Sequence, residues 1–189
     1  YVGNSHFLML NYFLLNIKQF KNIYFHGMNV DDNNNIIRCV PINHNLLNDP
    51  LFNIDIKNKN LTLYTISGPV SLSIFKYKNK RIYLFGDIHF SLANTCSKIN
   101  KYKNIKTIHI QKFLHNIFLK LNKQIDFYFE TIYLSKDFNK ISKKSTDQYI
   151  GLIFNEFIYC WSHDKHNNTY LNKCAKKYKT VRFHYADFR

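Results

Sequence analysis

The sequence predicts an α/β protein with a mostly parallel sheet, an antiparallel hairpin at one edge, helices packed on the sheet, and an N-terminal helical extension. Strand-like and helix-like segments alternate along the later part of the chain, which is typical of parallel strands joined by right-handed crossovers. Hydrophobic residues make up 46% of the 189 residues, enough to build a core. Glycine and proline are scarce, at five and three residues, so collagen-like, Gly-rich and Pro-rich classes are excluded.

Residues 1–59 are expected to form the extension and residues 60–189 the α/β domain. The apolar stretch over 7–25 is interrupted by Asn, Gln and Lys residues, so it predicts a core helix or packing arm and no transmembrane span. An Asn-rich loop over 29–35 and a short strand over 36–40 follow. Because so many apolar residues are costly to leave in water, we expect the start of the chain to be helical and packed against the domain or a partner.

The domain begins with strands. β-rich runs over 61–67 and 70–77, separated by Gly68-Pro69, predict a hairpin, and a strand over 81–85 follows. Within 106–122 the apolar residues then recur with the helical period of about 3.6 residues.

The rest of the domain repeats this alternation. A strand over 125–129, a second helical pattern over 147–161 and a strand over 180–184 complete the order. We expect the strands over 81–85, 125–129 and 180–184 to be neighbours in one mostly parallel sheet. Sites in such sheets form at the carboxyl ends of the strands.

Side chains that can bind a metal ion or take part in catalysis lie near the carboxyl ends of these three strands. They are Asp87, His89, Glu130, Arg182, His184, Asp187 and Arg189. Glu130 is one of only two glutamates and directly follows an apolar strand, where a carboxylate is costly unless a cation or hydrogen bonds compensate it. Gly86-Asp87 taken alone is more typical of an ordinary turn, but the convergence of several such strand ends predicts a pocket.

The expected pocket has two competing explanations. Carboxylates gathered at one sheet edge repel one another, and a divalent cation such as Mn or Zn would hold them ionised. The expected metal ligands are Asp87, His89, Glu130, His184 and Asp187, and the expected catalytic residues are Asp87, His89, Glu130, Arg182 and Arg189. A bound water would then be the nucleophile, with Glu130 as general base. In the alternative, an arginine fills the gap and forms a structural salt-bridge cluster.

The net charge of +15 favours a polyanionic partner. Arginine occurs at only four positions, so nearly all the cations are lysine. Because arginine is the residue of bidentate phosphate and guanine recognition, we expect nonspecific attraction to polyanions rather than specific nucleic-acid binding.

The four cysteines, Cys39, Cys96, Cys160 and Cys174, contain no CxxC pair and predict neither a zinc ribbon nor a redox motif. We expect free thiols in a reducing intracellular compartment. A zinc site that combines Cys160 and Cys174 with the histidines between them is the alternative.

The strand end Gly86-Asp87-Ile88-His89 resembles the first motif of calcineurin-like metallophosphoesterases, whose later GD and GNH motifs are missing here. It is more similar to the family that groups erythromycin esterase, ChaN and TIKI-like proteins. In that family a G-x-x-H or G-E-x-H strand end and a downstream strand-end Glu line one site, so the resemblance implies Gly86, His89 and Glu130 as counterparts. Asp87 replaces the usual Glu of the G-E-x-H form, and a second G-x-x-H is absent.

Over about residues 61–189, the chain resembles most closely the uncharacterised α/β proteins of large nucleocytoplasmic DNA viruses. The shared segments are the 67–69 turn, the 83–89 strand end, the 126–130 strand and the 181–189 terminus. The resemblance implies a viral metal-dependent hydrolase or its degenerate descendant, located in the host cytoplasm, the virus factory or the virion.

Two other functions stay open at this point. The first is a virion-associated structural protein, a minor capsid or core component, that uses its fold for packing and contacts virion or capsid proteins through the N-terminal aromatic segment. The second is a basic protein associated with nucleic acid through charge alone.

Overall fold

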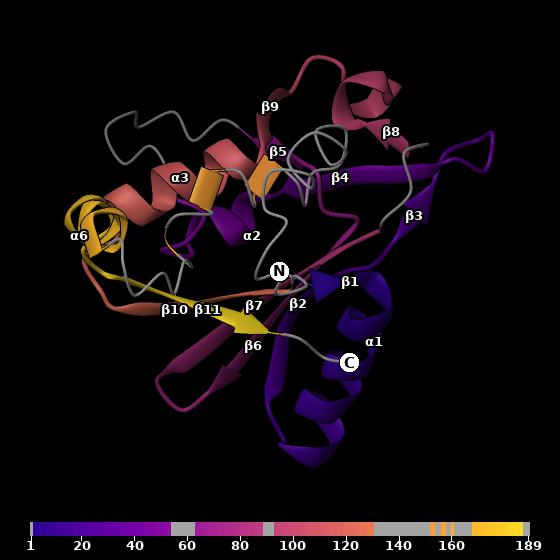
Figure 1. Cartoon of the computed structure of the whole chain (residues 1–189). Coiled ribbons are helices and arrows are strands. Elements are labelled where there is room, and N and C mark those ends of the chain that lie inside the picture. Colours follow the sequence, from indigo (N-terminus) through magenta and orange to yellow (C-terminus); the bar gives the residue numbers. More distant parts are fainter. Residues whose placement is uncertain are drawn as a thin grey trace, which may run out of the picture. The chain divides into compact units, whose positions relative to one another are not determined.

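The computed structural model describes residues 2–53, 63–88, 93–130, 152–153, 156–157, 160 and 168–186. Figure 1 shows the elements of the chain, which divides into two compact units. Unit 1 contains residues 1–43 and 62–109, and unit 2 contains residues 44–61 and 110–189. The residues expected to form an N-terminal extension are thus shared between the two units. Among the described residues, no helix has the length and apolar character needed to cross a bilayer.

The first sheet of unit 1 has four strands in the order β1-β7-β6-β2. Its elements are β1 (Val2–Gly3), α1 (Asn4–Tyr12), the π-helix η1 (Phe13–Ile17), β2 (Lys21–His26), β6 (Ser71–Tyr77) and β7 (Lys80–Asp87). Phe7 of α1 and Leu14 of η1 form a buried cluster with Val2, Phe75 and Leu84 of the strands. The predicted helix at the start of the chain therefore ends at residue 17. It packs on a sheet that includes β2, the strand that follows it in the sequence.

The second sheet of unit 1 runs in the order β3-β4-β5-β9, with β8 also paired to β4. The elements of this part are β3 (Asn29–Val30), β4 (Ile36–Ile42), β5 (Tyr64–Ser67), β8 (Ala93–Thr95), the 3-10 helices η2 (Cys96–Lys98) and η3 (Asn100–Tyr102), and β9 (Lys106–His109). Every residue of β5 is buried, as expected for a strand with a neighbour on each side.

Unit 2 is built around aromatic side chains. Its elements are α2 (His44–Leu47), α3 (Ile110–Lys120), β10 (Ile125–Glu130), α6 (Asn168–Lys177) and β11 (Val181–Ala186). The apolar stripe of α3 is buried as its period predicts. The ring of Phe118 lies 5.0–6.0 Å, between centroids, from the rings of Phe127, Phe157, Tyr178 and Phe183.

The predicted mostly parallel sheet is wrong, because the described strands form mixed sheets with mostly antiparallel pairing. β10 and β11 are parallel neighbours, as expected, but they form a sheet of their own, while β7 pairs with β6 antiparallel. The cause is the two-residue turn at Lys78-Asn79, where Lys78 adopts a φ of 53°. A positive φ in so short a connection is the geometry of a tight hairpin.

The predicted hairpin across Gly68-Pro69 is also wrong. β5 pairs with β4 and β9, whereas β6 pairs with β2 and β7. Gly68 has a φ of 133°, which a residue with a side chain rarely adopts. The chain uses this glycine to pass from one sheet to the other instead of folding back.

The expectation of free thiols is wrong as well. Cys39 is bonded to Cys96 in unit 1, and Cys160 to Cys174 in unit 2. The first pair follows from strand register, because Arg38 of β4 lies opposite Thr95 of β8. The residues that follow them are the two cysteines, which are 57 positions apart in the sequence. Spacing along the chain gives no sign of such a pair.

Candidate functional site

Asp87, the first carboxylate of the predicted site, is buried in unit 1 against an arginine from the other sheet. Nη1 of Arg38, in β4, lies 2.7 Å from Oδ1 of Asp87, and the two side chains are only 4% and 1% exposed. Nη2 of Arg38 donates to the carbonyl oxygen of Ile88, whose own N–H donates to Oδ1 of Asp87. The geometry at this carboxylate is that of a salt bridge joining two sheets, and the arginine is neither Arg182 nor Arg189.

Gly86 precedes this carboxylate because no larger residue fits there. A Cβ at Gly86 would lie 2.2 Å from Oγ of Ser71 and 2.9 Å from Cγ of Phe7. Ser71 is its partner in the β6–β7 ladder, and Phe7 is the buried anchor of α1. The Gly-Asp pair is therefore part of a packed strand rather than an ordinary turn.

The predicted convergence of the strand-end residues remains a prediction. His89, Asp187 and Arg189 lie outside the described residues. Asp87 belongs to unit 1, whereas Glu130, Arg182 and His184 belong to unit 2. Within the part of the chain that the structure describes, no three His, Cys, Asp or Glu side chains lie close enough to hold a metal ion.

Two of the predicted residues, Arg182 and His184, come together in unit 2 on a carboxylate that was not predicted, Asp126. β10 and β11 pair in parallel with Asp126 opposite Arg182 and Tyr128 opposite His184. Nε and Nη2 of Arg182 each lie 2.6 Å from a carboxylate oxygen of Asp126, which makes the pair bidentate. Glu130 ends the same strand face, two residues beyond Tyr128.

The same carboxylate also fixes the ring of His184. Nε2 of His184 lies 2.8 Å from Oδ1 of Asp126, and an ionised carboxylate can only accept, so Nε2 carries the proton and Nδ1 of the neutral ring keeps its lone pair. Hydrogen bonds from Arg182 and then His184 lower the pKa of Asp126, which keeps it ionised at neutral pH. Tyr128 stacks on His184 with ring centroids 4.6 Å apart, so the imidazole is oriented from two sides.

This face of the β10–β11 pair is open to water. Arg182 and His184 have side chains 56% and 37% exposed, and Tyr128 is 52% exposed. Phe127 and Phe129, which alternate with Asp126 and Tyr128 along the strand, are buried. The β10–β11 pair therefore packs one face against the aromatic core and carries an imidazole, a guanidinium and two carboxylates on the other.

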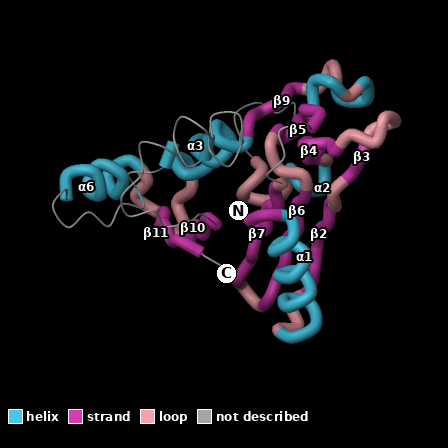
Figure 2. The backbone as a smooth tube through the Cα atoms, turned by 45° about the vertical axis from the view of Figure 1, so that its right-hand side comes forward, coloured by secondary structure: helices cyan, strands magenta, loops and turns pink. Residues whose placement is uncertain are grey.

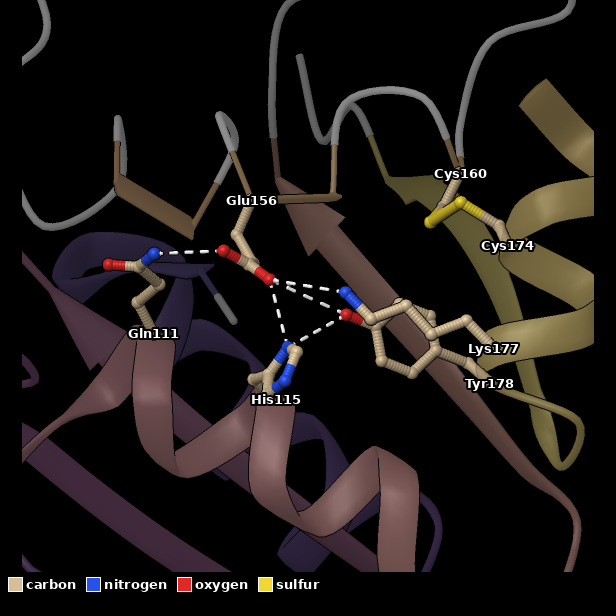
Figure 3. A network of polar contacts seen from close by, with 7 residues as sticks. All are labelled: Gln111, His115, Glu156, Cys160, Cys174, Lys177 and Tyr178. Atoms are coloured by element: carbon tan, nitrogen blue, oxygen red, sulfur yellow. Dashed lines mark hydrogen bonds and ion pairs between the residues drawn. A yellow bond between two sulfur atoms is a disulfide. The ribbon is translucent and has the colours of Figure 1, made fainter.

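A second polar network, which sequence reasoning missed, lies elsewhere in unit 2 (Figure 3). Nδ1 of His115, on α3, lies 2.9 Å from Oε1 of Glu156 and 2.9 Å from the hydroxyl of Tyr178. Gln111 donates to the other oxygen of Glu156 at 3.0 Å, and Lys177 lies 3.9 Å from Oε1. Burial and the Glu156 carboxylate raise the pKa of Tyr178 well above its ordinary value.

The Cys160–Cys174 disulfide supports this network. Glu156 and Cys160 are helical residues four positions apart, and the N–H of Tyr178 donates to the carbonyl of Cys174 at 2.7 Å. The covalent bond therefore joins the segments that carry Glu156 and Tyr178 (Figure 3). One signal was readable in the sequence, because Glu156 is the second of the two glutamates and lies within an apolar helical stripe.

Comparisons with known proteins give no further guide: no protein-family model, curated protein or solved structure matches this chain.

Proposed function

We propose that this chain is a hydrolase of anionic esters, and that His184 is its general base. The observation that carries the proposal is the contact of Asp126 with Nε2 of His184, on a carboxylate that Arg182 holds bidentately. A histidine whose far nitrogen is fixed by a carboxylate is the arrangement that hydrolases use to take a proton from a nucleophile.

In the proposed reaction, Nδ1 of His184 accepts a proton from water while the water oxygen bonds to the electrophilic carbon or phosphorus of the ester. The proton then passes from Nδ1 to the leaving oxygen as its bond breaks. Asp126 and Arg182 are positioning residues, because they act through the imidazole. Glu130, on the same face, is the acceptor that orients the attacking water.

The substrate class follows from charge. At a net charge of +15, the surface field draws anions toward the protein and raises their local concentration. No step is routed through a metal ion, since the described residues gather no set of ligands for one. The metals expected from the sequence, Mn and Zn, are tested in separate reactions of the experiment below.

The test is an assay with the intact chain on chromogenic phosphate and carboxylate esters, with added Mn, with added Zn and with chelator. We expect hydrolysis by the wild type, and a loss of kcat/KM of about 100-fold or more in His184→Ala. Asp126→Asn should lower kcat with little change in KM, because it disturbs the tautomer and not substrate binding. Glu130→Gln should lower kcat as well.

The matched control is His115→Gln, which disrupts a second histidine–carboxylate pair in the described part of unit 2 and should leave kcat/KM unchanged. Wild-type protein without activity on the whole panel, or a His184→Ala protein as active as the wild type, would overturn the proposal. If His115→Gln is the variant that loses activity, the general base is in the second network and His184 is structural.

A further inference from the structure

The helical segment at the start of unit 1 is apolar on both faces, because Phe7 and Leu14 are buried against the sheet while further large apolar side chains face solvent. α1 and η1 contain no charged residue between Asn4 and Ile17. Their large apolar side chains that face solvent, between 39% and 65% exposed, are Leu8, Met9, Tyr12, Phe13, Leu15 and Ile17. Contiguous exposed apolar surface of this kind marks an interaction site.

A polar residue of this helix faces inward instead. Asn11 is only 8% exposed. Its side-chain amide donates to the carbonyl of Phe7 at 2.8 Å and its oxygen accepts from the hydroxyl of Ser73, in β6, at 2.7 Å. The helical segment thus buries Phe7, Asn11 and Leu14 against the sheet and is apolar on its outer side as well, where an ordinary surface helix is polar.

The neighbouring edge strand extends the apolar surface. β2 is one of the two edge strands of its sheet, and its side chains Ile23 and Phe25 are 43% and 58% exposed. Phe25 shares the helix-covered face, since its ring centroid is 6.3 Å from that of Phe7. Helix and strand therefore offer apolar groups on one side of unit 1.

A set of cations lies at one end of this surface. The exposed lysines are Lys18, Lys21, Lys76, Lys78 and Lys80. They gather because Lys21 is opposite Lys76 in the β2–β6 ladder and the ring of Phe20 lies 5.2 Å from that of Tyr77. Figure 2 shows the end of the helix and the β6–β7 turn at the same end of unit 1. No Asp or Glu occurs in residues 1–30 or 71–86.

We propose that unit 1 docks on the surface of an anionic lipid bilayer through this apolar face and its lysine rim. Exposed apolar side chains enter the boundary between headgroups and acyl chains, while lysines beside them bind anionic headgroups. A nucleic acid would bind the lysines through its phosphates but would not bury the exposed leucine, methionine and isoleucine side chains. A second copy of the chain, placed face to face, would bring the lysine rims of two strongly basic molecules together.

The test is flotation of the intact chain with vesicles of phosphatidylcholine alone and with phosphatidylserine added. We expect the wild type to float with the anionic vesicles and to stay in solution with the neutral ones. Leu8→Ser, Met9→Ser, Tyr12→Ser, combined in one chain, should lower partitioning at least 10-fold, and so should Lys78→Glu, Lys80→Glu. Hydrogen exchange of residues 8–17 should slow when anionic vesicles are present.

Matched controls come from exposed positions of unit 2. Leu119→Ser removes an apolar side chain that is 50% exposed. The double variant Lys123→Glu, Lys176→Glu makes the same change of charge as Lys78→Glu, Lys80→Glu. Both should partition as the wild type does, and circular dichroism of each variant shows whether it is folded.

Three results would overturn the proposal. One is wild-type protein that does not float with anionic vesicles. The second is an apolar variant that is folded and partitions like the wild type, since binding would then rest on charge alone, as with nucleic acid. The third is a light-scattering mass of a dimer for the wild type and of a monomer for the Leu8→Ser, Met9→Ser, Tyr12→Ser variant, because a second copy would then cover this face. Failure of esterase activity would leave the docking surface unaffected, since the two sites lie in different units.

Discussion

The buried pair of Arg38 and Asp87 gives the sharpest stability prediction. Arg38→Met removes the guanidinium from a carboxylate that is 1% exposed and removes a donor from the carbonyl of Ile88. Breaking such a pair on one side costs about 3–5 kcal/mol, because the remaining charge is buried without its partner. That is a large fraction of the roughly 5–15 kcal/mol by which small proteins are stable.

Two further variants separate the buried charge from the lost packing. Arg38→Met, Asp87→Leu removes both charges and should recover most of the loss, since replacing a buried pair by apolar groups of similar volume is often close to neutral. Lys80→Met, an exposed substitution at the start of the strand that carries Asp87, is the matched control and should change stability little.

The assay is urea unfolding, combined with native-state hydrogen exchange of the β4 and β7 amides. Exchange is needed because a chain with two compact units need not unfold in one step. A cost below about 1 kcal/mol for Arg38→Met, the range of exposed ion pairs, would refute the reasoning. So would a double variant less stable than Arg38→Met alone.

Three more predictions test other parts of the structure. Gly86→Ala should destabilise unit 1 by about 1–3 kcal/mol in urea unfolding because its Cβ meets Ser71 and Phe7, and Ser71→Gly in the same chain should relieve part of the cost. Burial lowers the pKa of His26 from its ordinary value of 6.5, opposed by its bond to the Cys39 carbonyl. The unfolded chain therefore binds the proton more readily, so stability should fall as pH drops below about 6.5 and level off below the folded pKa of His26. In a plot of melting temperature against pH, His26→Gln should flatten this part of the curve. An unchanged slope in that variant would contradict the prediction. Cys160→Ser should cost about 3 kcal/mol, because the bond closes a loop between residues 14 positions apart. It should also speed hydrogen exchange at the Tyr178 amide, and exchange equal to the wild type would show that the disulfide does not support that network.

The candidate site was only partly readable from the sequence. Arg182 and His184 are candidates from the sequence alone because arginine is rare and both lie in the last predicted strand. Asp126 gives no such signal, because a carboxylate inside an alternating strand has the pattern of an ordinary solvent-facing residue. Its role depends on the parallel register with β11, which places it opposite Arg182. His115 and Glu156 are 41 positions apart, so no local spacing links them.

The sequence by itself determined the local elements whose pattern lies within a few residues. The buried stripe of α3 and the strands β10 and β11 are where periodicity places them, because side chains on one face of a helix or strand recur at a fixed interval. The predicted start of that helix is wrong, since residues 106–109 form the strand β9. It also determined the excess of lysine and the absence of acidic residues from the first 30 positions, since these are properties of composition.

Only the tertiary structure decided which strands pair, which cysteines bond and which cation meets each carboxylate. β7 pairs with β6 and is not part of the expected parallel sheet, because a two-residue turn places the two strands side by side. The alternation of strands and helices along the chain does not predict this pairing. Arg38 reaches Asp87 across 49 positions of sequence. Contacts over such separations are selected by the burial and hydrogen bonding of the whole unit, where many residues lower the free energy together, and not by the pattern around either residue.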